Sequence, residues 1–345
     1  MIRTLADRFW SAVAGDAQKR KSRTNQKVQE AQRELPVFPR FTATASALTQ
    51  ISRKVWEPQG LYEVERIRML EAKVEYLLDE IYRLKSIQRV LPGAVEVMAS
   101  LRDYQVSTFD YQWANIPYHD EFLSNPDWIA RAPLDAAERA GVAPEWFRNK
   151  KVLDCGCGPG RYAWALASLG ASVTAFDLSD RGLAEARERT ASFSDIRIDK
   201  LSILEPLPYA TDFDMVFCYG VLHHTGDTLG GLRNIARHVK PGGRIYLMLY
   251  AEPRRNNRGD YQYRHEISTL REATREMPFS EKAKICEQID GPTKTQQWFD
   301  AISSEINDLY TFEEIKTHLQ SMGFSDVKRT MPHEDQHNVA AIRTS

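Results

Sequence analysis

Three glycines at alternate positions separate two apolar runs in the stretch VLDCGCGPGRYAWALASLGASVTAFDLS. Gly156, Gly158 and Gly160 carry no side chain, so the backbone can approach a ligand closely and can adopt positive φ angles. Asp154 ends the first apolar run, and Asp177 ends the second. Two carboxylates around a glycine loop suit a ligand that carries both a positive group and hydroxyl groups.

The spacing of these residues discriminates between nucleotides. A nicotinamide-binding loop has the spacing G-x-G-x-x-G, whereas the spacing here is G-x-G-x-G. The carboxylate of Asp154 would repel a pyrophosphate and would instead attract an ammonium group. Asp177 is placed to accept hydrogen bonds from both ribose hydroxyls. A nucleoside with an amino-acid tail and no phosphate meets these conditions, and S-adenosylmethionine is such a ligand.

The elements around the loop alternate between strand-length apolar runs and helical patterns from residue 151 onwards. This alternation predicts a mostly parallel sheet with right-handed crossovers and helices on both faces. The helical patterns cover residues 160–169, 180–191 and 228–239. Thr311 and Glu314 predict a capping box for one more helix, which Gly323 ends. The last two runs, DVKRTM and NVAAIRTS, can pair as an antiparallel hairpin, so we expect an α/β, Rossmann-like sheet of seven strands.

A polar, charged and largely helical insertion, 251–310, interrupts the alternation after the fifth strand. It would lie at the carboxyl edge of the sheet, where ligands bind in open α/β folds. Arg254 and Arg255 follow the end of that strand at Tyr250 and could clamp a phosphate, a carboxylate or a sugar ring. Acidic residues dilute this positive charge, so a solvated helical face is the alternative for these arginines.

The chain before the sheet differs from the rest in composition and in the spacing of its apolar residues. Residues 1–58 are polar, basic and loop-rich, which predicts a partly disordered arm. Within it, residues 1–23 contain an apolar stripe and a basic cluster. These could contact a membrane or a partner, or the segment could form a frayed helix. Between 61 and 91, apolar residues recur at steps of three and four with charged flanks, which is typical of a coiled-coil helix. We favour self-association as a homodimer over a partner helix or docking within the chain. The predicted regions are therefore 1–58, 59–103 and 104–345.

Composition narrows the class of protein. The 345 residues include 46 Lys and Arg against 47 Asp and Glu, and this balance gives no case for nucleic acid as a partner. The four cysteines show neither a disulfide framework nor metal-ligand spacing, so we expect a cytoplasmic protein without a metal. No apolar run reaches the ~18 residues that span a bilayer.

The segment from residue 150 to 250 resembles class I S-adenosylmethionine-dependent methyltransferases. VLDCGCGPG is similar to the glycine motif of that family, and VTAFDLS to its ribose-binding acidic motif. FDMVFCYGVLHHTGD resembles the fourth-strand motif, and IARHVKPGGRIYLMLY the helix, turn and fifth strand. STFDYQWANIP and WFDAISSEINDLYTFEEIKTHLQSMGF resemble, more weakly, the aromatic lid and the closing segment of a bacterial branch of the family. The resemblance covers about two-thirds of the chain and leaves residues 1–100 unexplained.

The resemblance implies a role for each matching residue: Asp154 and the glycines would hold the methionine part, and Asp177 the ribose. The family usually has an acidic residue for the adenine amino group a few positions before a Leu-Pro pair. Counting back from that pair reaches Ser202, so we assign the adenine contact to Ser202 and its neighbour, with Asp199 as the alternative. The expected cofactor-binding residues are Tyr111, Trp113, Asp154, Gly156, Gly158, Gly160, Asp177, Leu178, Ser202, Ile203 and Tyr219.

Methyl transfer from a sulfonium requires mainly that acceptor, methyl and sulfur are aligned and that water is excluded. His223 and His224 follow the fourth strand, and either could be the base for a hydroxyl acceptor; alternatively, both fix the loop geometry. The rings of Tyr111 and Trp113 could cover the sulfonium or fasten the N-terminal arm to the sheet. Tyr250 faces the same edge.

These observations predict an enzyme that transfers a methyl group from S-adenosylmethionine to a small-molecule, sugar or glycan acceptor, with O-methylation favoured. An RNA-modifying methyltransferase of the same fold is one alternative, although it would normally show a basic face. A non-catalytic scaffold that works through its coiled coil is another, and the retained Asp154 and Asp177 speak against it.

Overall fold

The computed structural model describes residues 70, 73, 94–116, 126–254, 257–333 and 335–344. The chain separates into two compact units, Met1–Glu80 and Ile81–Ser345, and the second contains the whole sheet. The predicted arm and nearly all of the predicted coiled coil lie outside the described residues, although Leu70 and Lys73 are helical.

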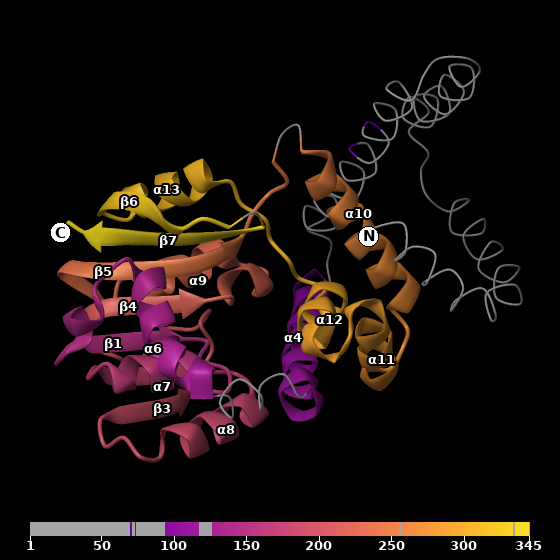
Figure 1. Ribbon diagram of the computed structural model, residues 1–345. Helices are drawn as coiled ribbons and strands as arrows, with labels where there is room; N and C mark the ends of the chain where they lie inside the picture. Colours follow the sequence, from indigo (N-terminus) through magenta and orange to yellow (C-terminus); the bar gives the residue numbers. More distant parts are fainter. Residues whose placement is uncertain are drawn as a thin grey trace, which may run out of the picture. The chain divides into compact units, whose positions relative to one another are not determined.

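A single seven-stranded sheet organises the second unit (Figure 1). Its strands are β1 (Lys151–Cys155), β2 (Ser172–Asp177), β3 (Ile196–Lys200), β4 (Phe213–Tyr219), β5 (Val239–Tyr250), β6 (Phe324–Met331) and β7 (Gln336–Arg343). Their order is β3-β2-β1-β4-β5-β7-β6. The first five strands are parallel, and β7 runs antiparallel to both β5 and β6. The predicted Rossmann-like sheet with a C-terminal hairpin is confirmed.

The helices of the described residues are α4 (Ala94–Asn115), α6 (Pro126–Ala140), α7 (Arg161–Ser168), α8 (Asp180–Thr190), α9 (Thr228–Ala236), α10 (Arg258–Thr274), α11 (Phe279–Asp290), α12 (Thr295–Ser303) and α13 (Phe312–Ser321), with single turns at η1 (Pro144–Phe147), η2 (Leu222–His224) and η3 (Pro292–Lys294). The capping box of α13 is present: the Glu314 backbone N–H donates to the Thr311 hydroxyl, and the Thr311 backbone N–H donates to the Glu314 carboxylate. None of the helices in this part of the chain is long and apolar enough to cross a membrane.

Two apolar layers hold the sheet between helices. On β1, Val152 packs into the layer shared with α6, α7 and α8, whereas its neighbour Leu153 packs into the layer shared with α9 and α13. Successive strand residues point to opposite faces, so both must be apolar when both faces are covered. This explains why the parallel strands read as continuous apolar runs rather than as alternating ones.

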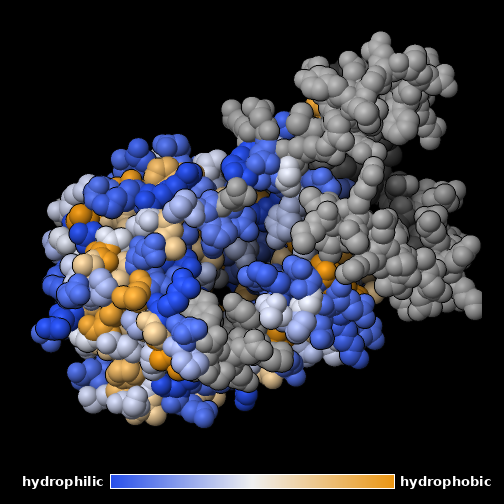
Figure 2. Space-filling view, in the orientation of Figure 1, coloured by the Kyte–Doolittle hydropathy of each residue, from blue (hydrophilic) through white to orange (hydrophobic). Residues whose placement is uncertain are grey.

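Helices α4, α10, α11 and α12 gather beyond the carboxyl ends of the parallel strands (Figure 1). Helix α4 packs against both α12 and α8, and α12 packs against α10 and α11. The predicted region boundary at residue 104 therefore falls inside one continuous helix. The visible surface over α11 is mainly hydrophilic (Figure 2), as expected for the polar insertion.

Candidate active site

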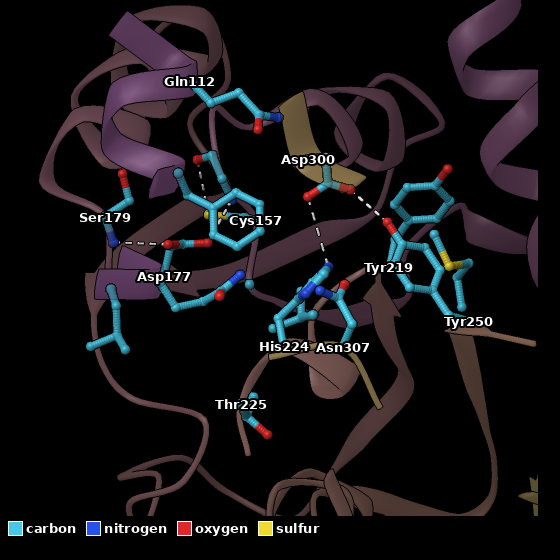
Figure 3. A pocket seen from close by; sticks show the side chains of 18 of the residues that line it. Gln112, Cys157, Asp177, Ser179, Tyr219, His224, Thr225, Tyr250, Asp300 and Asn307 are labelled. Atoms are coloured by element: carbon cyan, nitrogen blue, oxygen red, sulfur yellow. Dashed lines mark hydrogen bonds and ion pairs between the residues drawn. The ribbon is translucent and has the colours of Figure 1, made fainter. Parts of the chain in front are cut away.

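A cavity of about 760 Å³ lies between the carboxyl ends of the strands and helices α4, α10 and α12. Its volume falls within the range of roughly 300–1,000 Å³ that is usual for small-molecule sites. The glycine loop, the end of β2 and the segment after β3 line one half, and the end of β5 with α10 and α12 lines the other. Figure 3 shows side chains from both halves turned towards this space.

The glycine loop adopts the backbone conformation that the sequence predicts. The φ angles of Gly156, Gly158 and Gly160 are 74°, 50° and 81°. A Cβ atom on Gly156 would lie 2.3 Å from Val221, and one on Gly158 would lie 3.3 Å from Trp113 on the cavity wall.

Gly160 serves a different purpose from the one expected. A Cβ atom there would lie 2.8 Å from Ala186, and Gly160 is not among the residues that line the cavity. The missing side chain lets α7 and α8 approach each other. Gly160 therefore has a packing role in this structure, and its assignment to the cofactor stays a prediction.

Asp154 is buried on the cavity wall, and its Oδ2 atom has no hydrogen-bond partner. Burial, and after it the nearby Asp177 carboxylate, raise the pKa of this carboxyl to about 7, against the Arg161 guanidinium, which acts to lower it. A buried acceptor without a donor is rare in folded proteins. It fits a ligand that brings its own donor, as an ammonium group does.

Asp177 is held in place by the backbone. Its two carboxylate oxygens accept hydrogen bonds of 2.8 Å from the N–H groups of Gly158 and Ser179. Burial raises the pKa of Asp177, and these two N–H groups lower it. The second lone pair of each oxygen can still accept a ribose hydroxyl.

The segment after β3 supplies the wall next to Asp177. Leu178, Ser202 and Ile203 all line the cavity, as predicted for an adenine site. The alternative, Asp199, instead accepts a hydrogen bond of 2.8 Å from the hydroxyl of Tyr209 and is not among the lining residues. The geometry therefore favours Ser202 over Asp199.

Helix α4 covers the cavity with one of the two predicted aromatic rings. Trp113 lines the cavity, and its ring stacks on Phe109 with centroids 6.1 Å apart. Tyr111 faces away, and its ring lies 5.5 Å from Phe299 and 5.4 Å from Phe279 in the insertion. Residues two apart on a helix point to different sides, so Tyr111 does not line the cavity beside Trp113, and its cofactor contact stays a prediction.

The two histidines of η2 have different surroundings. His223 is fully buried, neither of its ring nitrogens has a hydrogen-bond partner, and burial lowers its pKa well below the ordinary value. It is not among the cavity-lining residues, whereas His224 is. The proposed proton-transfer role therefore remains geometrically open to His224 and not to His223.

Burial favours the neutral form of His224, and a hydrogen bond defines the tautomer of that form. Its Nδ1 atom lies 2.8 Å from the carbonyl oxygen of Ile306, which can only accept, so Nδ1 carries the proton and the Nε2 lone pair is left available. Burial lowers the pKa of His224, against the Asp300 carboxylate, which raises it. The Oδ1 atom of Asp300 is 3.9 Å from Nε2, and its Oδ2 atom accepts a hydrogen bond of 2.5 Å from the Tyr250 hydroxyl (Figure 3).

Sequence reasoning missed Asp300, because no strand end marks it, and the segment WFDAISSEIND in which it lies was given no site role. It also missed Arg161, which directly follows the glycine loop and whose guanidinium lies 5.1 Å from the ring of Tyr219 on the cavity wall. An arginine at the first position of the helix after a cofactor loop could have been noticed.

Of the two arginines of the predicted clamp, Arg254 is described, and it does not line the main cavity. Arg254 is engaged by Asp260 through contacts of 2.8 and 2.9 Å and lines an adjoining groove, which shares Tyr263 and Arg264 with the main cavity. Arg255 lies outside the described residues. Tyr250, by contrast, lines the main cavity as expected.

The strand order and the glycine loop beside a β2 carboxylate define a nucleotide-binding α/β protein of the Rossmann-like class. Residues 153–245 match the family described as a methyltransferase domain. This segment, which begins in β1 and ends in β5, is therefore similar to a methyltransferase domain.

Two curated relatives and one solved structure illustrate the similarity. The chain is 37% identical over 135 residues to a ubiquinone biosynthesis O-methyltransferase of Pseudomonas aeruginosa, covering 38% of this chain and 52% of that protein. It is 35% identical over 147 residues to an uncharacterized protein of Synechococcus, covering 41% and 35%. The chain thus spans about half the length, or less, of the curated relatives it matches. The magnesium protoporphyrin IX methyltransferase of Synechocystis, solved with bound S-adenosylhomocysteine, has a TM-score of 0.46 and 19% identity over 71% of this chain and 99% of that chain.

Proposed function

We propose that the protein transfers a methyl group from S-adenosylmethionine to a hydroxyl oxygen of a small-molecule acceptor, and that sugars and glycans belong to the range of acceptors to be tested. The observation that carries the proposal is the cavity that brings Asp154, Asp177 and His224 to one space. The first two suit the cofactor, and the third suits a proton on the acceptor. The similarity to a ubiquinone biosynthesis O-methyltransferase supports the same chemistry.

The half of the cavity lined by the glycine loop, which we call the loop half, suits the cofactor because it contains buried acceptors that lack hydrogen-bond donors. Asp154 Oδ2 and Gln112 Oε1 are buried acceptors without donors, and both residues line the cavity. An ammonium group supplies donors for both. Arg161, on the same wall, would hold the carboxylate of the methionine part, and Asp177 would accept the ribose hydroxyls. The ring of Trp113 would cover the sulfonium.

The other half of the cavity fits a hydroxyl acceptor. When bound, S-adenosylmethionine supplies an electrophilic methyl group, whose transfer leaves a neutral thioether. The Nε2 lone pair of His224 can take the proton of the acceptor hydroxyl as its oxygen forms the new bond. The Asp300 carboxylate then stabilises the imidazolium, and its own position is fixed by Tyr250.

Calorimetric titration of the full chain with S-adenosylhomocysteine tests the cofactor half of the proposal. We expect the wild type to bind, Asp177→Ala to bind at least about tenfold more weakly, because charge-assisted hydrogen bonds are lost, and His224→Gln to bind as the wild type does. Absence of binding to the wild type would refute the proposal.

Transfer of a labelled methyl group from S-adenosylmethionine to a panel of hydroxylated aromatic and sugar-linked compounds tests the acceptor half. We expect His224→Gln to lower the transfer rate by about 10²-fold, whereas His223→Gln, a matched change beside it, leaves the rate close to that of the wild type. Equal loss in both variants would assign the histidines to loop geometry rather than to proton transfer.

A further inference from the structure

Two arginines of α10 line the half of the cavity that is formed by the end of β5, α10 and α12, which we call the cap half. Arg264 and Arg271 are seven residues apart, which places them on the same face of the helix two turns from each other. Both line the main cavity, on the same side as Tyr250 and Asp300. The guanidinium of Arg264 lies 6.0 Å from the centre of the Tyr250 ring and 5.8 Å from that of Tyr263.

Neither arginine is neutralised by an ion pair with a described residue. Each donates one hydrogen bond to a carbonyl oxygen: Arg264 Nη2 to Ala251 at 3.1 Å, and Arg271 Nη2 to Ala301 at 2.6 Å. A guanidinium has five N–H donors, and the buried Nε of Arg271 has no partner. Arg275, one turn further along the chain, is by contrast 2.9 Å from Glu272.

The acidic groups around the pair are engaged elsewhere. Asp300 accepts from Tyr250 and faces His224, and Asp335 pairs with His333 at 2.5 Å. Glu305 lies 3.9 Å from Arg275. Burial lowers the pKa of Arg271, and the neighbouring Arg264 lowers it further, against Glu305, which raises it. A bound anion would offset the positive charge of both arginines.

We propose that Arg264 and Arg271 bind an anionic oxygen group, a carboxylate or a phosphate, on the methyl acceptor, so that the acceptor hydroxyl is held at His224. This inference rests on the proposed methyl transfer and narrows its substrate class to hydroxylated acids or phosphate esters. The planar fork of donors on each guanidinium matches both groups. Neither Gln nor Lys could replace an arginine here without loss of anion binding, because neither combines a positive charge with a planar fork of donors.

The test compares ligands that differ by one charge. The full chain, saturated with S-adenosylhomocysteine, is titrated calorimetrically with 4-hydroxybenzoate, with 4-hydroxybenzamide and with 4-hydroxyphenyl phosphate. We expect the acid or the phosphate ester to bind at least about tenfold more tightly than the neutral amide. Whichever of the two binds more tightly identifies the anion.

Three variants then locate the preference. Arg264→Gln and Arg271→Gln are each expected to reduce the preference for the anion about tenfold. Arg275→Gln, a matched change at the residue that directly follows α10 and does not line the cavity, is expected to leave the preference unchanged. Retained affinity for S-adenosylhomocysteine shows that each variant is folded. A wild type that binds the amide as well as the acid and the ester, or a preference that survives both cavity substitutions, would overturn the inference.

A final arm separates this inference from the proposed function. Inorganic phosphate is titrated into the cofactor-free wild type and into the same three variants, with the thermal unfolding temperature as the readout. Stabilisation that is lost in Arg264→Gln and Arg271→Gln supports the anion site even where S-adenosylhomocysteine fails to bind. Wild-type protein that neither phosphate nor the two anionic probes affect would overturn it.

Discussion

Asp154 connects cofactor binding to pH in a way that can be worked out quantitatively. In the folded protein without cofactor the pKa of this carboxyl is about 7, against an ordinary value of 3.8. Between these two pH values the folded chain holds a proton that the unfolded chain has lost, so stability falls as pH rises through that window. A difference of about three pH units, at about 1.4 kcal/mol for each, amounts to about 4 kcal/mol at pH 8.

The replacement Asp154→Asn removes this cost while keeping the shape of the side chain. We expect the variant to be more stable than the wild type at pH 8, by up to about 4 kcal/mol, and to be similar to it near pH 4. Urea denaturation of both proteins at the two pH values measures the difference. A wild type that is equally stable or more stable relative to the variant at pH 8 would contradict the raised pKa.

Cofactor affinity should change in the opposite direction. The ammonium group of S-adenosylhomocysteine pairs with the ionised carboxylate, so binding at pH 5.5 first requires the loss of a proton from a group whose pKa is about 7. This makes wild-type binding about thirtyfold weaker at pH 5.5 than at pH 8. Asp154→Asn should bind weakly at both values. Calorimetric titration decides, and pH-independent binding by the wild type would refute the assignment of Asp154 to the ammonium group.

Three further substitutions separate structure from function. Gly160→Ala places a methyl group 2.8 Å from Ala186 at a φ of 81°, so we expect a loss of about 2–4 kcal/mol in urea denaturation, and a loss below 1 kcal/mol would contradict the packing role. Thr311→Ala removes the capping box of α13 and should cost about 1 kcal/mol, measured in the same way, without changing the affinity for S-adenosylhomocysteine. His223→Leu removes two buried ring nitrogens that have no partner, so the free energy of unfolding should change little or rise, and a loss of several kcal/mol would indicate a hydrogen bond that the structure does not show.

The sheet could be predicted because its signals are local and repeated. Buried parallel strands must be apolar on both faces, and Gly156 and Gly158 stand where the chain needs positive φ angles next to a ligand. The capping box of Thr311 is likewise set by residues three positions apart. Each of these features depends on neighbours along the chain, which is why one sequence was enough to find them.

The acceptor side of the cavity could not be predicted in this way, because it is assembled from distant segments. Asp300 meets His224 across 76 positions only because α12 folds back over the strand ends. Arg264 and Arg271 look in the sequence like any charged residues of a solvated helix, whereas Arg254, which directly follows a strand, looks functional and is engaged by Asp260. The direction of a helix face is set by tertiary packing, which charge patterns do not report.

One half of the cavity has hydrogen-bond acceptors without donors, and the other half has donors without acceptors. This difference would orient a bound methyl acceptor. The loop half contains buried acceptors at Asp154 and Gln112, and the cap half contains donors at Arg264 and Arg271. A cationic ammonium is attracted to the first half, and an anionic acceptor group to the second. An acceptor anchored by its anion in the cap therefore presents its other end to His224, between the two halves. Positioning of this kind can supply a large part of the rate of a displacement that needs little other catalysis.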